Sequence, residues 1–163
     1  MCLGPRDTCA KTQTEKSAAI KALVSPLRTP YPSPAPSGSE LNPSSTHLLD
    51  LPHSTRTYKL LLSGGHFDTS TQKLSIPDPT LSTAFASAFW EAIISEDADG
   101  EKNARRIAKG NATFVMVEMV QALVAAGRRE EVKRVLAGEQ CILDIRNTER
   151  KGASLLADKL ADL

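Results

Sequence analysis

The sequence is poor in the residues from which most active sites and metal sites are built. It contains three histidines and three cysteines in 163 residues, and aromatic side chains make up 4%. The cysteines at positions 2, 9 and 141 are odd in number and widely spaced, which argues against a disulfide framework and a zinc site. No His-Glu-x-x-His, Gly-x-Ser-x-Gly or P-loop pattern occurs, so we expect no enzyme, no cofactor and no small-molecule substrate.

One acidic stretch, Asp97-Ala-Asp99-Gly100, is superficially similar to a calcium-binding loop. If Gly100 were the sixth loop position, Arg106 would be the twelfth, where calcium requires a bidentate carboxylate. An arginine at that position carries the wrong charge for a cation site. We therefore expect no bound metal.

Long apolar runs are also missing. The longest lies between Ala112 and Ala126, and it is too short to span a membrane and is interrupted by Glu118 and Gln121. Residues 1–10 contain no apolar run, which argues against a secretory signal. We expect a soluble, intracellular protein with no membrane partner.

Neither sign of charge dominates the composition. Twenty Lys and Arg residues stand against 19 Asp and Glu residues, which gives a formal net charge of +1. Overall charge therefore predicts no polyanionic partner, and binding of a nucleic acid would need local basic patches. A hydrophobic content of 40% permits one ordinary domain with a core.

Proline marks the organisation of the chain. Seven of the ten prolines lie between Pro26 and Pro52, mixed with Ser, Thr and Gly. This composition predicts an exposed loop, either a flexible connector or a Pro-motif ligand for a partner domain. The predicted organisation is a disordered N-terminus at 1–13, a helix at 14–25, the loop at 26–52 and a helical repeat domain at 53–163.

Apolar side chains recur at helical spacing from residue 53 onward. Helices are predicted near 54–62, 80–95, 101–109, 111–126, 129–136 and 151–163, with a short extended piece at 72–76. Residues 142–145 fit either a strand or a helix. The helix at 111–126 is apolar nearly all round, which predicts a central position. Because no run of alternating strands occurs, the predicted fold class is all-α.

Three of the expected helices, at 53–62, 110–120 and 151–160, share a small or polar start followed by an apolar stripe. The starts at Gly110 and Gly152 lie about 40 residues apart, within the period of stacked helical repeats. Two interpretations stay open: a true repeat, or the likeness that any two amphipathic helices share. A true repeat would make this chain the end of an array, or a small array.

Basic side chains gather in three places along the chain. Lys102, Arg105, Arg106 and Lys109 are spaced by three and four residues and so share much of one helix face. The other groups are Arg128, Arg129, Lys133 and Arg134, and then Arg146, Arg150 and Lys151. Several cations within reach of one strand would bind RNA phosphates. The alternative interpretation is a solvated helix face, which the acidic residues between 91 and 101 favour.

Four stretches, taken together, resemble one family. They are residues 15–20 (EKSAAI), 50–68 (DLPHSTRTYKLLLSGGHFD), 109–118 (KGNATFVMVE) and 150–160 (RKGASLLADKL). In this order and spacing they resemble the CPL domain of Penguin-like Pumilio-family proteins. The run that ends in Gly-Gly-His-Phe is the most specific piece.

This resemblance implies an α-helical solenoid of Pumilio/armadillo-like repeats, with this chain as its end. Because the family's upstream array is missing from the sequence, we expect a C-terminal fragment, a truncated gene product or a solitary domain. It also implies binding to the backbone of rRNA or mRNA without strong sequence preference. Further implications are pre-ribosomal protein partners, a nuclear and nucleolar location, and a role in large-subunit ribosome biogenesis. Some members are linked to translation regulation of mRNA.

A base-reading Pumilio helix presents three side chains to RNA, and the resemblance aligns a triplet in each repeat helix. The triplets are Thr55, Arg56 and Lys59; Thr113, Phe114 and Val117; and Ala153, Ser154 and Ala157. Only the first keeps polar or charged groups throughout, while the others suit packing or a cap. We therefore predict phosphate contacts rather than a base code, at Thr55, Arg56, Lys59, Arg105, Arg106 and Lys109. The alternative function is a non-catalytic protein-docking or solenoid-capping module.

Overall fold

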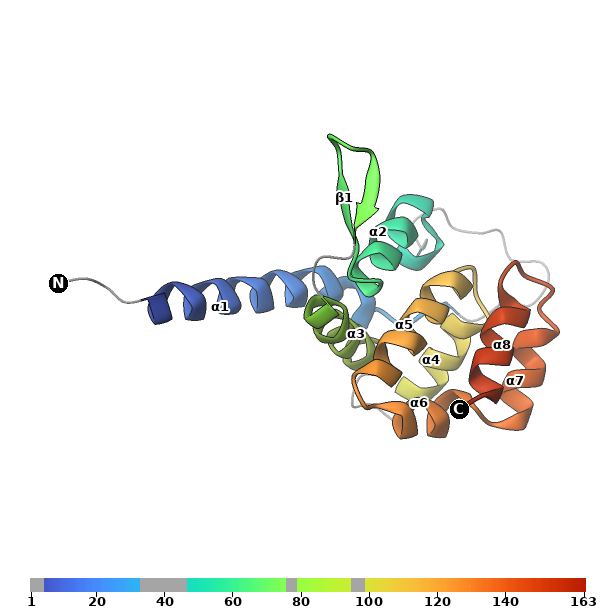
Figure 1. Cartoon of the computed structure of the whole chain (residues 1–163). Helices are drawn as coiled ribbons and strands as arrows, with labels where there is room; N and C mark the ends of the chain where they lie inside the picture. The colour runs from blue at the N-terminus through green and yellow to red at the C-terminus, as the bar shows by residue number, and fades with distance from the viewer. Residues whose placement is uncertain (1–4, 33–46, 76–78, 95–98) are drawn as a thin grey trace.

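The computed structural model describes residues 5–32, 47–75, 79–94 and 99–163, with the backbone alone at 5–12, 66–67 and 74–75. Helices dominate these residues, and the predicted all-α class is confirmed (Figure 1). The α-helices are α1 (Pro5–Val24), α2 (Pro52–Leu62), α3 (Pro79–Ile94), α4 (Gly100–Ala108), α5 (Thr113–Ala125), α6 (Arg129–Leu136), α7 (Glu139–Arg146) and α8 (Ala153–Ala161).

The N-terminal helix is longer than the sequence predicted. Residues 1–13 were expected to be disordered, but α1 begins at Pro5 and continues to Val24. Proline is well accepted in the first helical turn, where its missing N–H needs no partner, and neither Pro nor Gly follows before residue 25. Figure 1 shows α1 extending away from the body of the molecule, and residues 13–19 are exposed.

The described ends of the predicted Pro-rich loop are packed rather than exposed. Short 3₁₀ turns form at η1 (Ser25–Arg28) and η3 (Leu48–Asp50), and Leu27, Tyr31, His47 and Leu49 are buried. Burial of Leu27, Tyr31 and Leu49 among the prolines makes both ends part of the core, which corrects the boundary drawn at residues 26–52. The middle of the predicted loop, residues 33–46, lies outside the described residues.

Helix α2 ends at Leu62, where the sequence predicted, and two glycines follow it. The chain reverses at Gly64, whose φ of +67° suits glycine. Its amide donates to the Leu61 carbonyl at 3.1 Å, and the Gly65 amide donates to the Leu60 carbonyl at 3.1 Å. These two bonds satisfy the last carbonyls of the helix in the Schellman pattern. A small hairpin then follows, with strand β1 (His66–Asp68) antiparallel to strand β2 (Lys73–Ser75).

The remaining helices lie close to their predicted bounds. Helix α6 coincides with the prediction, and the stretch at 142–145 belongs to helix α7. The extended piece expected at 72–76 is strand β2, whose partner β1 was not predicted. Within the described residues, none of the helices combines the length and the apolar character that crossing a membrane requires.

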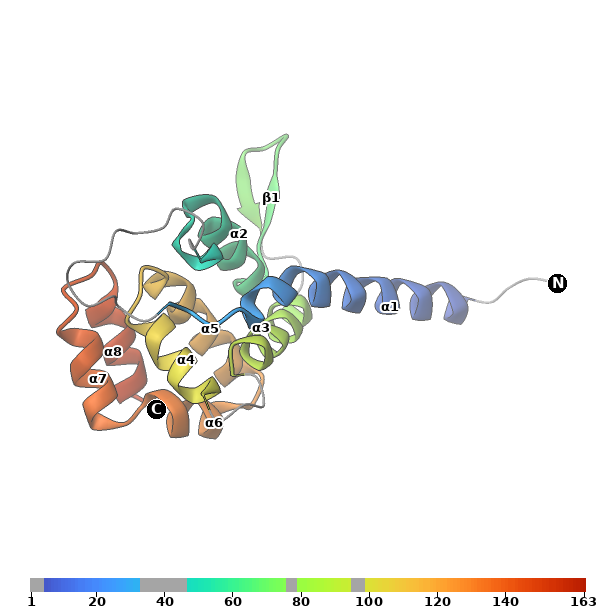
Figure 2. The same ribbon diagram turned by 180° about the vertical axis from the view of Figure 1, so that it is seen from behind.

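Helix α5 is the centre of the fold, as its apolar surface predicted. It contacts α2, α3, α4, α6 and α8. Helices α2, α5 and α8, which carry the three similar sequence stretches, are arranged with α5 between the other two. In Figure 1 α5 lies in front of α4, whereas Figure 2, from behind, brings α4 to the front. The molecule thus has two helical layers, with α5 and α4 in different ones.

Candidate functional site

The surface between α2 and α5 forms a shallow hollow of about 190 Å³. It combines charged side chains, a hydrogen-bonding amide and an aromatic ring. Its lining residues are Thr55, Arg56, Lys59, Asn111, Ala112, Phe114 and Val115. We call this hollow the α2–α5 groove. The whole first predicted triplet is part of it.

Burial of the other side of α2 fixes which residues of that helix face the groove. Tyr58 and Leu62 are buried, and the Tyr58 hydroxyl donates to the Leu23 carbonyl at 2.9 Å. Tyr58 also meets the ring of Phe89 edge to face, with centroids 5.7 Å apart. Because Thr55 and Lys59 are four residues apart, they lie one turn apart on the same side of the helix.

Phe114 is the aromatic element of the groove, and it is 44% exposed. The sequence placed it in packing, and its neighbours Thr113 and Val117 are indeed buried. A Cβ added at Gly152 would lie 3.0 Å from the Phe114 ring, so the backbone there supports the ring closely. The Lys59 ammonium lies over the ring, 5.5 Å from its centroid.

A hydrogen-bonded network borders the groove and orients Asn111. Asp50 accepts from the Tyr31 hydroxyl at 2.6 Å and from the Asn111 side-chain amide at 2.9 Å. Burial, and then the bond to Asp50, raise the pKa of Tyr31 to about 12. Arg150 donates to the Asn111 side-chain oxygen and so lies beside the groove. Gly110 is required here because any Cβ would collide with the Tyr31 hydroxyl.

The two cations of α2, Lys59 and Arg56, differ in whether a carboxylate lies near them. The Lys59 ammonium lies 3.9 Å from the Glu118 carboxylate, a long contact between partly exposed groups. Arg56 is exposed and forms no ion pair with any residue that the structure describes. Thr55 donates its hydroxyl to the Pro52 carbonyl at 2.9 Å, so its proton is used within the helix. Arg56 is therefore the most available charged group.

The basic face predicted on α4 lies elsewhere. Arg105 donates to the Val135 carbonyl at 2.9 Å and pairs with Glu101 at 3.6 Å, while Lys109 pairs with Asp144 at 3.4 Å. These contacts point toward α6 and α7. Arg105 and Lys109 line a different hollow, of about 230 Å³, together with Val135, Gly138, Gln140, Cys141 and Asp144. The structure therefore does not bring them together with Arg56 and Lys59.

The other two cations of the α4 group are Lys102 and Arg106. Lys102 pairs with Asp99 at 2.8 Å, one turn before it. Arg106 is partly buried and forms no ion pair within the described part of the chain. Cys141 is only partly buried, and that burial raises the pKa of its thiol. Most of the α4 cations are thus neutralised by nearby carboxylates.

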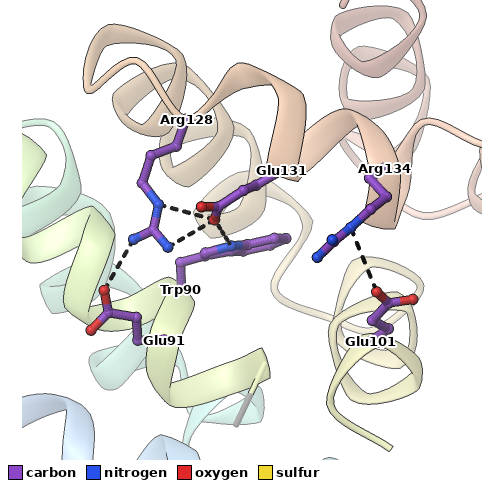
Figure 3. Close-up of polar contacts among 6 residues, drawn as sticks. All are labelled: Trp90, Glu91, Glu101, Arg128, Glu131 and Arg134. Atoms are coloured by element: carbon purple, nitrogen blue, oxygen red, sulfur yellow. Dashed lines mark hydrogen bonds and ion pairs between the residues drawn. The ribbon is translucent and has the colours of Figure 1, made fainter. Parts of the chain in front are cut away.

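The second basic group, at α6, connects neighbouring helices through hydrogen bonds and ion pairs (Figure 3). Arg128 donates to Glu131 at 2.7 Å and pairs with Glu91 at 3.2 Å. The buried Trp90 donates its indole N–H to the same Glu131 carboxylate at 3.1 Å. The bonds from Arg128 lower the pKa of Glu131. Arg134 pairs with Glu101 at 3.8 Å, so this cluster joins α3, α4 and α6 rather than forming an open basic patch.

Sequence reasoning missed Asn111 in the groove and Arg150 beside it as members of one site. Asn111 and Arg150 are 39 positions apart and meet only because α5 and α8 pack together. The sequence signal that could have found Asn111 was its place in the stretch 109–118 beside the second triplet. In the third triplet Ala153 and Ala157 are buried and Ser154 is exposed, as packing positions and a helix surface require.

The described residues contain no group of three or more His, Cys, Asp or Glu side chains placed to hold a metal ion. Fold and site together define an all-helical domain with an open groove that carries cations and an aromatic ring. No family model, no curated protein and no solved structure matches this chain.

Proposed function

We propose that this domain binds single-stranded RNA, without strong sequence preference, through the α2–α5 groove. The observation that carries the proposal is the half-exposed Phe114 ring flanked by Lys59 and Arg56. An aromatic face beside cations is the combination that binds single strands, because a base stacks on the ring while the cations meet the phosphates.

Stacking of a base on the Phe114 ring is more favourable than the present contact of the ring with the Lys59 ammonium. Stacking of one base on an aromatic side chain contributes about 1–3 kcal/mol. The exposed contact between Lys59 and Phe114 contributes only about 0.5–1 kcal/mol. Since Lys59 has a flexible stem, an arriving base displaces its ammonium from the ring, and the ammonium then contacts a phosphate.

The size of the groove supports the same choice. Pockets for small-molecule ligands usually enclose about 300–1,000 Å³. At about 190 Å³ the groove is smaller and open, which suits one flat group of a longer ligand better than a whole metabolite. A polynucleotide lies across such a surface and inserts single bases.

The proposal includes a helical-repeat arrangement for this surface. Helices α2, α5 and α8 contact in that order, and each carries one of the similar sequence stretches. A strand that crosses α2 and α5 therefore continues toward Arg150, just before α8. With the sequence resemblance, we extend the proposal to a nuclear or nucleolar role on rRNA or mRNA, in large-subunit maturation.

The proposed contacts differ from those expected from sequence. Arg56 and Lys59 stay, Phe114, Asn111 and Arg150 are added, and the contribution of Arg105 and Lys109 is withdrawn because carboxylates neutralise them. Arg106 is also withdrawn, since it belongs to α4 and does not line the groove. The remaining cations are few, so binding is expected to be modest and sensitive to salt.

Charge reversal of the groove tests the proposal. We expect the double variant Arg56→Glu and Lys59→Glu to bind a labelled single-stranded RNA of about 12 nucleotides at least tenfold more weakly than the unmodified chain at low salt. The matched control reverses Lys16 and Lys21 on the projecting helix α1, with the same change in net charge. Fluorescence anisotropy measures both. Equal losses in the two variants would show that the groove has no special role.

Protein docking is the second candidate, and one observation favours it. Helix α1 extends from the body with a long exposed surface, which is typical of a segment that meets another molecule (Figure 2). The same titration separates the two functions. An unmodified chain that binds no RNA at low salt supports docking and refutes RNA binding.

A further inference from the structure

Hydrogen-bond donors outnumber hydrogen-bond acceptors among the side chains of the α2–α5 groove. Its charged groups, Arg56, Lys59 and the neighbouring Arg150, are donors only. The two neutral polar groups add few acceptors, since the Thr55 hydroxyl donates its proton to Pro52 and keeps only its oxygen lone pairs, and the Asn111 amide bonds both Asp50 and Arg150. No carboxylate lines the groove among the described residues, so a base inserted there meets an excess of donors.

Purines differ in how they suit such a surface. Guanine presents two adjacent acceptors, O6 and N7, on the edge away from its pairing face, whereas adenine replaces O6 with an amino donor. An amino group facing a guanidinium gains no hydrogen bond and opposes another donor. We infer that the groove prefers guanine to adenine, with the base stacked on Phe114 and its O6 and N7 accepting from Arg56. This inference rests on the proposed RNA binding and adds a bias to it.

Arg56 is the residue that provides this bias, for two reasons. Its guanidinium is exposed and forms no ion pair with the described residues, whereas Lys59 is close to Glu118 and the Phe114 ring. The planar guanidinium also matches a pair of adjacent acceptors, which a single ammonium does not. Both Arg56 and Phe114 line the same hollow, so one base can meet both.

The expected size of the bias is small because the groove is open to solvent. A bidentate contact of arginine with guanine discriminates by about five- to 150-fold, and exposure places this site at the low end, at about fivefold. The bias is compatible with the otherwise sequence-tolerant binding, since stacking on Phe114 and the phosphate contacts of Lys59 and Arg150 are the same for every base, while Arg56 meets a phosphate when the stacked base is not guanine.

The test uses the full chain and four RNAs that differ in one base. Each is an oligouridine of about 12 nucleotides with one central purine: guanosine, inosine, 7-deazaguanosine or adenosine. Inosine keeps O6 and N7, and 7-deazaguanosine lacks N7. We expect guanosine and inosine to bind about fivefold more tightly than adenosine, and 7-deazaguanosine to lose most of that gain.

The variant Arg56→Lys separates base preference from charge. It keeps the positive charge at an exposed position and removes the planar pair of donors, so the ratio of guanosine to adenosine affinity should fall to about one, whatever the change in overall affinity. Arg28→Lys, at an exposed position in η1, is the matched control and should keep the gain. A preference that persists in Arg56→Lys would overturn the assignment.

Failure of this inference differs from failure of the proposed function. If the four RNAs bind equally and charge reversal at Arg56 and Lys59 still abolishes binding, RNA binding stands and the guanine bias is wrong. If adenosine binds more tightly than guanosine, the donor argument is refuted. If none of the four binds at low salt, the proposed function itself is wrong and the bias falls with it.

Discussion

Replacement of Phe114 by alanine is the most informative single perturbation of the groove. The ring is 44% exposed, and it stacks a base only if it also stays supported by the backbone at Gly152. Loss of one stacked base is worth about 1–3 kcal/mol, which corresponds to a five- to 150-fold rise in Kd for single-stranded RNA. We expect Phe114→Ala to fall within that range.

The effect of this substitution on stability has to be separated from its effect on binding. A fully buried Phe→Ala change costs about 3–5 kcal/mol, and a ring that is half exposed should cost about 1–2 kcal/mol. Leu155 on α8 is 45% exposed, so Leu155→Ala is a matched control for stability at a site outside the groove. Urea unfolding monitored by the single tryptophan, Trp90, measures both variants.

The assay is fluorescence anisotropy of the same labelled RNA with three variants. Phe114→Ala should weaken binding, Phe114→Trp should retain it because the larger ring still stacks, and Leu155→Ala should bind as the unmodified chain does. Equal affinity of Phe114→Ala and the unmodified chain, with both folded, would refute a stacking role for this ring.

Two further predictions concern the stability of the fold. His47 is buried and uses both ring nitrogens, donating from Nε2 to the Thr29 carbonyl and accepting from the Leu49 amide, and burial lowers its pKa below 6.5. Because the pKa of His47 is depressed in the folded state, its contribution to stability is complete above pH 6.5 and is lost as pH falls below that value. Urea titrations between about pH 7.5 and 5.5 should therefore show a smaller loss of unfolding free energy for His47→Gln than for the unmodified chain. An equal loss in the two proteins would contradict this. Gly152 and Gly127 both have positive φ, but only at Gly152 would a Cβ press on the Phe114 ring. Gly127→Ala should therefore cost about 1–2 kcal/mol for its backbone alone, and Gly152→Ala should cost more and also weaken RNA binding, as thermal unfolding and anisotropy will measure.

Local signals were enough to predict most helices. Helix α6 was predicted correctly because Gly127 stops the preceding helix and an amphipathic pattern follows it. The central place of α5 followed from its all-round apolar surface. The early start of α1 was missed because a helix that contacts little else gives no amphipathic pattern.

The site could be predicted only in part, because pairings between distant residues decide it. Lys109 and Asp144 are 35 positions apart, and their ion pair removes a cation that the helix pattern had offered to RNA. The exposure of Phe114 depends on how α8 packs beside α5, which no local pattern encodes. Arg56 and Lys59 were predicted from the resemblance, which aligns them with the triplet of a Pumilio repeat helix, and both line the groove.

The central claim is that a few cations of the α2–α5 groove meet RNA phosphates. For single strands, log Kd changes with log salt concentration by about 0.7 for each phosphate neutralised, so Arg56, Lys59 and Arg150 together predict a slope of about 2. Anisotropy titrations of the full chain between about 50 and 200 mM salt measure that slope directly. A slope near 2 that falls to about 0.7 or below after charge reversal at Arg56 and Lys59, which leaves Arg150, is the predicted result. Binding that is independent of salt, or unchanged by the reversal, would contradict the account.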